Sequence, residues 1–435
     1  MITLQERVHS VPPPSDWSLS KLHRVFRVRK GQKNTGMQED NLLSLSYGRV
    51  IEKNIDTAEG LLPESFETYQ IVEPGNIVMR LTDLQNDKRS LRQGLVNERG
   101  IITSAYDALE LERGHDSRFW AYTLLALDLA KYYYSLGGGV RQSIKFSDFP
   151  NDWIAAPNTE TQKAIADFLD RETARIDQLI EKKQRLMEVL GEGLAALLEE
   201  ATTPGEKIFD EMIPFRWVCR ITEGQVDPTE SCWASKPLIA PNHIQSGTGR
   251  LLKIETAEEQ GAISGKYAYP TGTVLYSKIR PALAKACIAP QAGMCSADMY
   301  PILPDRRLLP EFLLMQLLSR KFTDWATLES MRVAMPKINR ETLGNYRLWI
   351  PDRETQTRLA ARYQAAKAAR EPVSDKVSAS ISRLREFRTA LITAAVTGQI
   401  DVATWGKRSE IDRRLEKIEE DMTTPRAAGQ MAAQA

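Results

Sequence analysis

The hydrophobic pattern of the chain changes after Pro157, where short strand-like stretches give way to a long helical period. In residues 158–204 we place a seam with alternating four- and three-residue spacing, as in a coiled coil. Seven of its ten positions are apolar, namely Ile165, Leu169, Ile176, Leu179, Leu186, Leu190 and Leu197. Asn158 or Thr159 is suited to cap the helix start. We predict a helix of about 40 residues, roughly 60 Å long at 1.5 Å per residue.

A second segment, 352–401, has the same length and seam. Eight of its ten seam positions are apolar, and they include Leu359, Val373, Val377, Leu384 and Leu391. We predict that the two helices pair as an antiparallel coiled coil; the alternative is two independent helices, each docked on its own domain. Pro372 is a defect in this pattern, because proline should kink or break the second helix near its middle.

The chain also repeats itself. Glu160-Thr161-Gln162 recurs as Glu354-Thr355-Gln356, and the Trp153-Ile154 pair upstream recurs as Trp349-Ile350. Further matches upstream keep the same order, with offsets of 192 to 197 residues, far beyond the period of a solenoid. Chance similarity is the alternative, but the preserved order favours a domain duplication.

The fold class is therefore α+β, with two duplicated mixed α/β domains separated by the two long helices. Residues 72–80 and 272–277 read as turn followed by strand, and residues 117–135 and 310–325 as helices. We divide the chain into a first domain (1–157), a central helical spacer (158–204), a second domain (205–351), a C-terminal helical spacer (352–401) and a partly disordered tail (402–435). The stripe of Ile411, Leu415 and Ile418 makes that tail either a partner-binding helix or a frayed extension.

Composition is that of an ordinary globular protein. Of 435 residues, 42% are hydrophobic and 26% charged, and the formal net charge is +1, which argues against a uniformly basic, histone-like protein. Local basic runs are nevertheless present, as at 331–347, where four Arg or Lys residues stand against Glu341 alone. Such loops suit phosphate and base-edge contacts, although a solvated surface is the alternative for any single run. The candidate DNA-contacting residues are Arg80, Lys88, Arg89, Arg92, Arg141 and Lys145 in the first domain, and Lys278, Arg280, Arg332 and Lys337 in the second.

Recognisable catalytic motifs are missing from the sequence. It contains no G-x-x-x-x-G-K-[ST] phosphate loop and no G-x-S-x-G, and its four cysteines include no C-x-x-C pair. We therefore expect neither a catalytic site nor a metal site on this chain. No apolar leader or stretch of 18 apolar residues occurs, so we expect a cytoplasmic protein without a membrane segment.

Several strings resemble one family. Residues 160–177 and 384–402 are similar to the central and C-terminal helical regions of HsdS, the specificity subunit of type I restriction-modification systems. Ser277-Lys278-Ile279-Arg280-Pro281 matches a string common in the target-recognition domains of that family. Residues 82–87, with Leu91-Arg92, resemble one recurring type of these domains.

The resemblance implies a non-catalytic DNA-recognition subunit of a methyltransferase and endonuclease complex. Each domain would read one half of a split DNA target, and the helices would set the spacer and dock two methylation (M) subunits. Two restriction (R) subunits would join for cleavage. No cofactor is implied on this chain; S-adenosylmethionine would bind the M subunits, and ATP with Mg²⁺ the R subunits. The competing interpretations are a scaffold that binds no DNA and a self-contained enzyme with an unrecognised site.

Overall fold

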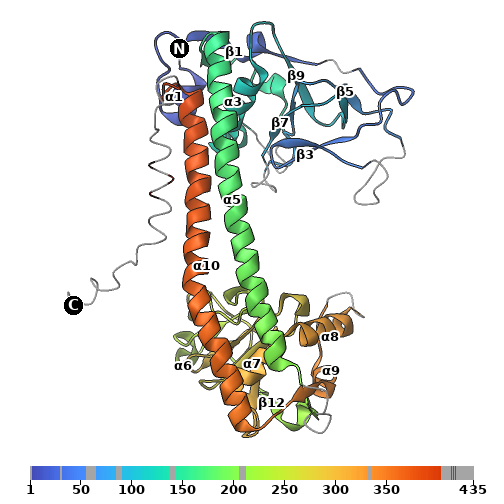
Figure 1. Cartoon of the computed structure of the whole chain (residues 1–435), viewed down its shortest axis with the longest axis vertical. Helices are drawn as coiled ribbons and strands as arrows, with labels where there is room; N and C mark the ends of the chain where they lie inside the picture. The colour runs from blue at the N-terminus through green and yellow to red at the C-terminus, as the bar shows by residue number, and fades with distance from the viewer. Residues whose placement is uncertain are drawn as a thin grey trace, which may run out of the picture. The chain divides into compact units, whose positions relative to one another are not determined.

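The computed structural model describes residues 2–29, 32–54, 65–84, 91–136, 143–204, 212–331 and 336–402, together with Arg413, Leu415 and Lys417. The predicted tail beyond residue 402 lies almost wholly outside this description. The chain forms two compact units: residues up to Gln184 and from Val377 onward make unit 1, and Arg185–Lys376 make unit 2. Each unit combines one strand-rich domain with one part of each long helix (Figure 1).

The first domain, within unit 1, is built on a four-stranded antiparallel sheet of order β2-β9-β6-β7, with three further strand pairs, β1-β10, β3-β4 and β5-β8. Its elements are α1 (Leu4–His9), β1 (Ser18–Lys21), α2 (Leu22–Val25), β2 (Phe26–Val28), β3 (Leu43–Ser46), β4 (Arg49–Glu52), β5 (Gln70–Val72), β6 (Ile77–Met79), β7 (Gln93–Leu95), β8 (Gly100–Ile102), β9 (Asp107–Leu111), α3 (Ser117–Leu129), α4 (Tyr132–Ser135), η1 (Phe146–Asp148) and β10 (Trp153–Ala156).

The second domain, within unit 2, repeats this layout. Its sheets have the orders β12-β19-β16-β17, β13-β15-β18-β14 and β11-β20, so the main sheet and the terminal pair match those of the first domain strand for strand. The elements are β11 (Met212–Pro214), η2 (Phe215–Trp217), β12 (Cys219–Ile221), β13 (Gln225–Val226), α6 (Ser231–Ala234), β14 (Leu238–Ile239), η3 (Pro241–His243), β15 (Lys266–Tyr269), β16 (Val274–Ser277), η4 (Pro281–Leu283), β17 (Ala286–Ile288), β18 (Gly293–Cys295), β19 (Met299–Pro304), α7 (Pro310–Leu318), α8 (Arg320–Ser330), α9 (Arg340–Asn345) and β20 (Arg347–Trp349).

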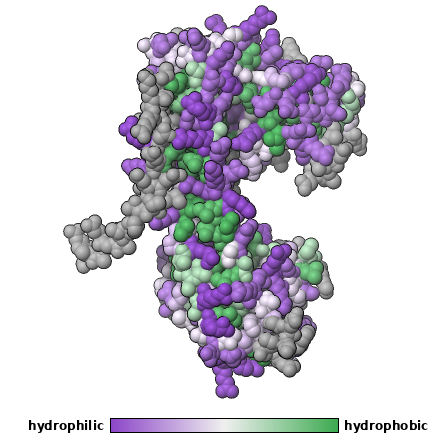
Figure 2. Space-filling view, viewed as in Figure 1, coloured by the Kyte–Doolittle hydropathy of each residue, from purple (hydrophilic) through white to green (hydrophobic). Residues whose placement is uncertain are grey.

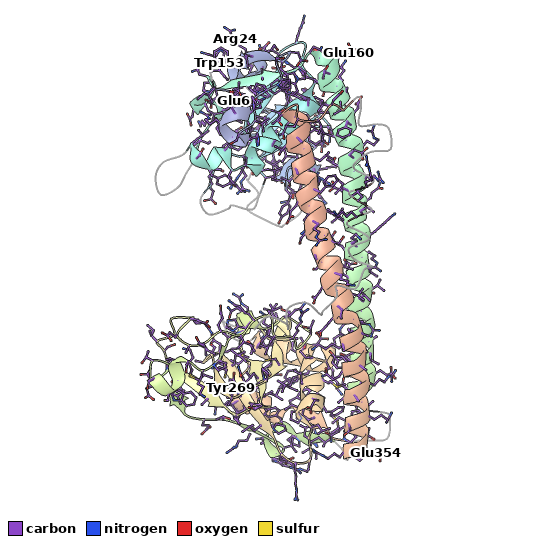
Figure 3. All side chains as sticks on the ribbon, turned by 90° about the vertical axis from the view of Figure 1, so that its left-hand side faces the viewer. Glu6, Arg24, Trp153, Glu160, Tyr269 and Glu354 are labelled. Atoms are coloured by element: carbon purple, nitrogen blue, oxygen red, sulfur yellow. The ribbon has the colours of Figure 1, made fainter. Side chains whose placement is uncertain are left out.

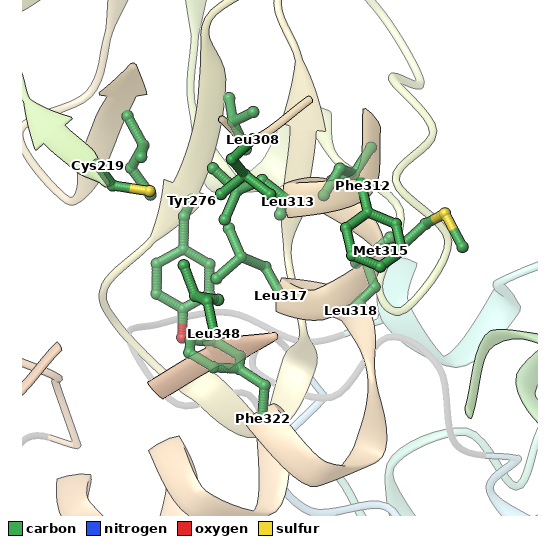
Figure 4. Close-up of a cluster of buried hydrophobic side chains, with 14 of the residues drawn as sticks. Cys219, Tyr276, Leu308, Phe312, Leu313, Met315, Leu317, Leu318, Phe322 and Leu348 are labelled. Atoms are coloured by element: carbon green, nitrogen blue, oxygen red, sulfur yellow. The ribbon is translucent and has the colours of Figure 1, made fainter. Parts of the chain in front are cut away.

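One helix fills the core of the second domain. All residues of α7 from Phe312 to Leu318 are buried, as expected for a helix that is apolar on every side. They pack with Tyr276 of the sheet and with Phe322 of α8 (Figure 4). The predicted helix at 310–325 is therefore two helices, because Ser319 caps a new start: its hydroxyl accepts from the N–H of Phe322.

The two long helices begin with the same device. In α5 (Thr159–Thr202) the Asn158 carboxamide oxygen accepts from the N–H of Thr161 at 2.9 Å, and in α10 (Arg353–Val396) the Asp352 carboxylate does the same for Thr355. Glu160 and Glu354 mark these first turns in Figure 3.

The glutamine of each repeated Glu-Thr-Gln string lies one position beyond the capped threonine and is buried. The Gln162 amide donates to the carbonyl of Pro157 at 2.8 Å, and its oxygen accepts from the N–H of Asp116 at 3.0 Å. Gln356 makes the matching bonds to the carbonyl of Pro351 and the N–H of Leu309. The repeated string therefore satisfies backbone groups that would otherwise be buried without partners.

The helices pack antiparallel, which confirms the predicted arrangement. In unit 1 the Arg388 guanidinium on α10 donates two hydrogen bonds to the Asp177 carboxylate on α5, with N···O distances of 2.9 and 3.2 Å. In unit 2 the Arg362 guanidinium on α10 donates two hydrogen bonds to the Glu200 carboxylate on α5, and the shorter N···O distance is 2.8 Å. The residue numbers of the partners on α10 therefore decrease as those on α5 increase, as they must in an antiparallel pair.

Two of the predicted pairing residues lie on the surface of the helices. Leu186 and Val373 are each 43% exposed, and Figure 2 shows hydrophobic surface over this middle stretch of the helices. The other predicted pairing residues are buried (Ile165, Leu169, Ile176, Leu359, Val377, Leu384 and Leu391) or half-buried (Leu179 and Leu190).

Leu186 is exposed because the buried stripe of α5 does not repeat every seven residues. Ile165, Ile176 and Leu198 are buried and Met187 is half-buried, so the inward stripe recurs every 11 residues. Eleven residues are close to three full turns of a straight α-helix, whereas a seven-residue seam drifts by about 20° per repeat unless the helices supercoil. Positions chosen with a strict seven-residue spacing therefore rotate away from the buried face in the second half of α5.

Of the kink or break expected at Pro372, the break does not occur, because α10 continues from Arg353 to Val396. Proline removes the hydrogen bond to the carbonyl four residues earlier, that of Ala368. Both residues are exposed, so water can satisfy that carbonyl. The cost of the proline is thus reduced by its place on the solvent side.

Candidate nucleic-acid interface

The predicted DNA-contacting residues fall into two groups. Lys88, Arg89, Arg141 and Arg332 lie outside the described residues. The other six are described: Arg80, Arg92 and Lys145 in the first domain, and Lys278, Arg280 and Lys337 in the second.

In the second domain two segments far apart in sequence lie side by side at the end of β16. Ile279 and Lys337 form an antiparallel bridge. The N–H of Arg280 donates to the carbonyl of Pro336, and the N–H of Ile338 donates to that of Lys278, both at 2.9 Å. The three predicted residues of the described part of this domain are thereby brought together.

Aromatic rings support this basic group. The Lys278 ammonium lies 5.5 Å from the centre of the Tyr300 ring, and the Arg340 guanidinium lies 5.7 Å from the same ring and 6.0 Å from that of Tyr267. Arg340 is also paired with Glu223 at 2.6 Å. We call Lys278, Arg280, Lys337, Arg340, Tyr267 and Tyr300 the second-domain patch. Cation–π contacts of this kind hold long cationic side chains in place.

Three cationic side chains of the patch are not neutralised by a described carboxylate. Arg280 and Lys337 are exposed and Lys278 is half-buried. Within the described part of the chain, none of these three has a carboxylate within ion-pair distance, unlike Arg340. The patch can therefore offer cationic donors to an anionic partner such as a phosphate.

Sequence reasoning missed Arg340, Tyr267 and Tyr300. Arg340 lies in the basic run 331–347, so the signal was present although the residue was not selected. The two tyrosines come from β15 and β19, and nothing in the sequence places those strands beside the run.

Arg280 has an unusual backbone conformation. Its φ of 47° lies in the left-handed region, which is uncommon for a residue with a β-carbon. Asp83, at the matching turn of the first domain, has a φ of 57°. Strained residues of this kind cluster at binding and active sites, so both turns are marked as candidate functional positions.

The first domain has the same backbone arrangement at the end of β6, which we call the junction. The N–H of Ile144 donates to the carbonyl of Leu81 at 3.0 Å, the counterpart of the bond between Ile338 and Lys278. Half-buried Arg80 directly precedes Leu81, and exposed Lys145 directly follows Ile144. Both predicted residues therefore border this junction.

Arg92 is different, because its side chain is fully buried and cannot reach DNA in this conformation. Its Nε donates to the hydroxyl of Tyr134 and its Nη1 to the carbonyl of Thr82, both at 3.2 Å. Its backbone N–H donates to the Asp128 carboxylate at 2.7 Å. We therefore remove Arg92 from the set of proposed DNA contacts.

Burial raises the pKa of Asp128 to about 6, despite the hydrogen bond from Arg92 and the charges of Lys131 and Arg92. A carboxyl whose pKa is higher in the folded state favours folding at low pH. We expect the Asp128 carboxyl to add between about 1 and 2 kcal/mol to the free energy of unfolding as the pH falls from 7.5 to 5. Asp128→Asn should lose this increment, as measured by urea unfolding at pH 7.5 and pH 5. An identical pH response in both proteins would contradict the assignment.

The described residues contain neither a cluster of metal ligands nor a membrane-spanning helix. No group of three or more His, Cys, Asp or Glu side chains there could hold a metal ion. None of the described helices combines the length and apolar character needed to cross a membrane.

Comparison with known proteins points to one class. No family model matches the chain. The specificity subunit of the type I restriction enzyme EcoDI from Escherichia coli is 28% identical over 316 residues, which cover 65% of this chain and 70% of the relative.

Two solved structures resemble the chain to different degrees. A chain in a structure describing complex assembly and conformational transition of the type I R-M system has a TM-score of 0.63 and 15% identity, covering 89% of this chain and all of that one. The crystal structure of the HsdS subunit from Thermoanaerobacter tengcongensis gives a TM-score of 0.42 at 15% identity, covering 91% of this chain and all of the other. The first of these likenesses establishes a shared fold.

Proposed function

This chain belongs to the specificity subunits of type I restriction-modification systems, and from that premise we propose that each of its two domains reads one half of a bipartite DNA target. As a specificity subunit it is the non-catalytic, target-recognising member of its complex.

One observation carries the proposal: the two domains present different side chains on one backbone frame. The matched turns place Asp83 in one domain and Arg280 in the other, both in the left-handed conformation. The matched positions before these turns hold Leu81 and Lys278. Because base recognition depends on which donors and acceptors face the groove, domains with one frame and different side chains are suited to read different sequences.

The second-domain patch supports DNA as the ligand. Exposed Arg280 and Lys337 can contact phosphates or pair with guanine, and the tyrosine rings hold the neighbouring cations. In the first domain we propose Arg80, Lys145 and, outside the described residues, Lys88, Arg89 and Arg141 for the same task. Arg332 is the corresponding proposal for the second domain.

The long helices act as the spacer in this proposal. Two modules on one chain bind a split target with raised effective concentration only if their separation matches the separation of the half-sites. We further propose that the helices dock two M subunits, and that two R subunits complete the restricting complex. S-adenosylmethionine then belongs to the M subunits and ATP with Mg²⁺ to the R subunits, with no cofactor on this chain.

The test is co-expression with the M subunit, followed by methylome sequencing and gel shifts. We expect one bipartite methylated motif and tight binding only to DNA that carries both half-sites. Binding should drop at least tenfold when either half-site is scrambled. A complex without sequence preference would favour the scaffold alternative, and turnover of S-adenosylmethionine or ATP by the isolated chain would favour the enzyme alternative.

A further inference from the structure

The ends of two loops in the first domain meet at one buried side chain. The first loop lies between Thr82 and Arg92, and the second between Tyr134 and Ile144. Arg92 bonds Thr82 and Tyr134 through its guanidinium, while the N–H of Ile144 bonds the carbonyl of neighbouring Leu81. All four loop ends are thus tied by hydrogen bonds.

We propose that Arg92 is a positioning residue for DNA recognition: it touches no DNA but holds the described loop ends at Thr82 and Tyr134 in place, and so determines how strictly the first half-site is read. This inference rests on the proposed function, because two proposed DNA contacts border this junction. The N–H of Arg80 donates to the Arg92 carbonyl, and Lys145 directly follows Ile144.

The backbone of Arg92 is held as firmly as its side chain. Its carbonyl accepts from the N–H of Arg80 at 2.7 Å, and its N–H donates to the Asp128 carboxylate, also at 2.7 Å. The bond to Arg80 continues the β6–β7 ladder, and the bond to Asp128 joins the loop end to α3. A shift of Arg92 would therefore disturb the sheet, the helix and the loop ends at Thr82 and Tyr134 together.

Arginine is the side chain that this geometry requires. A guanidinium directs several N–H groups along fixed lines, so it can bond the Tyr134 hydroxyl and the Thr82 carbonyl at once. The Tyr134 ring also lies 5.5 Å from the guanidinium. Lysine carries a single nitrogen on a flexible stem and cannot reproduce this fixed fork.

A buried cation in a purely structural role would be an expensive choice. Desolvating a guanidinium costs several kcal/mol, which a well-packed apolar side chain avoids. The buried Asp128 carboxylate lies close enough to interact electrostatically with Arg92. Holding the two loop ends in place gives a reason for a buried charged pair here, whereas the need to fill space does not.

The second domain provides an internal control, because it holds the matching position differently. There the carbonyl of Lys285 accepts from the N–H of Ser277 at 2.9 Å, as that of Arg92 does from Arg80. The Lys285 ammonium, however, donates to the carbonyl of Pro241. Changes at Arg92 should therefore leave the reading of the second half-site intact.

The experiment compares Arg92→Lys, Arg92→Met and Tyr134→Phe with the wild-type chain, each in complex with the M subunit. The control is Arg24→Met, which removes an exposed arginine of the same domain. Binding is measured to duplexes with single substitutions in either half-site, and methylomes are sequenced. A mismatch ordinarily costs about 5- to 150-fold in affinity.

We expect discrimination at one half-site to fall to below threefold in Arg92→Met and by a smaller factor in Arg92→Lys and Tyr134→Phe. Discrimination at the other half-site should be unchanged in all three, and Arg24→Met should behave as wild type. Unchanged discrimination in Arg92→Lys and Tyr134→Phe, or an equal loss at both half-sites in Tyr134→Phe at unchanged melting temperature, would overturn the inference.

The outcomes also separate this inference from its premise. If Arg92→Met unfolds, Tyr134→Phe decides, since it removes one hydroxyl and keeps the ring. If the wild-type complex shows no bipartite target, the proposed function fails. If the wild type reads both half-sites and Tyr134→Phe reads them as strictly, only the role of Arg92 fails.

Discussion

Insertion of four residues into both long helices lengthens the spacer of the methylated target by one or two base pairs and leaves both half-sites unchanged. The insertions follow Gln184 in α5 and Lys376 in α10, where the chain passes between units. Four helical residues add about 6 Å and about 40° beyond a full turn. One base pair adds about 3.4 Å and about 35°, and two add about 6.8 Å and 70°. Activity on the original target should fall to background.

Controls for the insertion follow from the antiparallel pairing. The same four residues placed in α5 alone should abolish methylation, because they shift the bonding of Arg362 to Glu200 relative to that of Arg388 to Asp177. Placed after Val402, beyond α10, they should have no effect. Methylome sequencing gives the spacer directly. An unchanged spacer in the double-insertion protein would show that the helices do not set it.

Replacement of Arg280 by alanine weakens binding to the cognate duplex by about 5- to 150-fold, the range for loss of one arginine–guanine pair. If Arg280 contacts a phosphate instead, the loss is uniform across sequences and the salt slope falls by about 0.9. Gel shifts at two salt concentrations, with cognate and scrambled duplexes, distinguish these outcomes. Unchanged affinity at both salt concentrations would remove Arg280 from the interface.

Because the backbone of Arg280 is left-handed, the alanine variant needs a second variant that removes the charge with less backbone strain. Alanine is strained at a φ of 47°, whereas asparagine adopts this region readily. Arg280→Asn therefore removes the charge with less strain and should weaken binding as much as Arg280→Ala. Arg306→Ala is the control, because this exposed arginine follows the far end of β19, away from Tyr300. A loss seen only with alanine would indicate strain at the turn.

Much of the candidate site was visible in the sequence as basic runs, but the role of each residue was not. Arg280 and Lys337 were selected from separate runs, and the structure joins them through the bridge between Ile279 and Lys337. Arg92 was selected on the same grounds and proved to be buried. A basic residue in a loop has the same local signature whether it faces solvent or the domain interior, because burial depends on strands that the run does not contain.

The sequence alone determined the elements that depend on local chemistry: the duplication, the two long helices, a cap for the first of them at Asn158 or Thr159, and the turn-and-strand segments. Helix propensity, capping and hydrophobic period act within a few residues, so they can be read along the chain. Tertiary structure alone decided that the stripe of α5 recurs every 11 residues, that Pro372 is tolerated on an exposed face, and that Arg92 is buried and bonded to Thr82 and Tyr134. Each of these depends on which surface of an element is covered by residues distant in sequence, and that is set only when the chain packs.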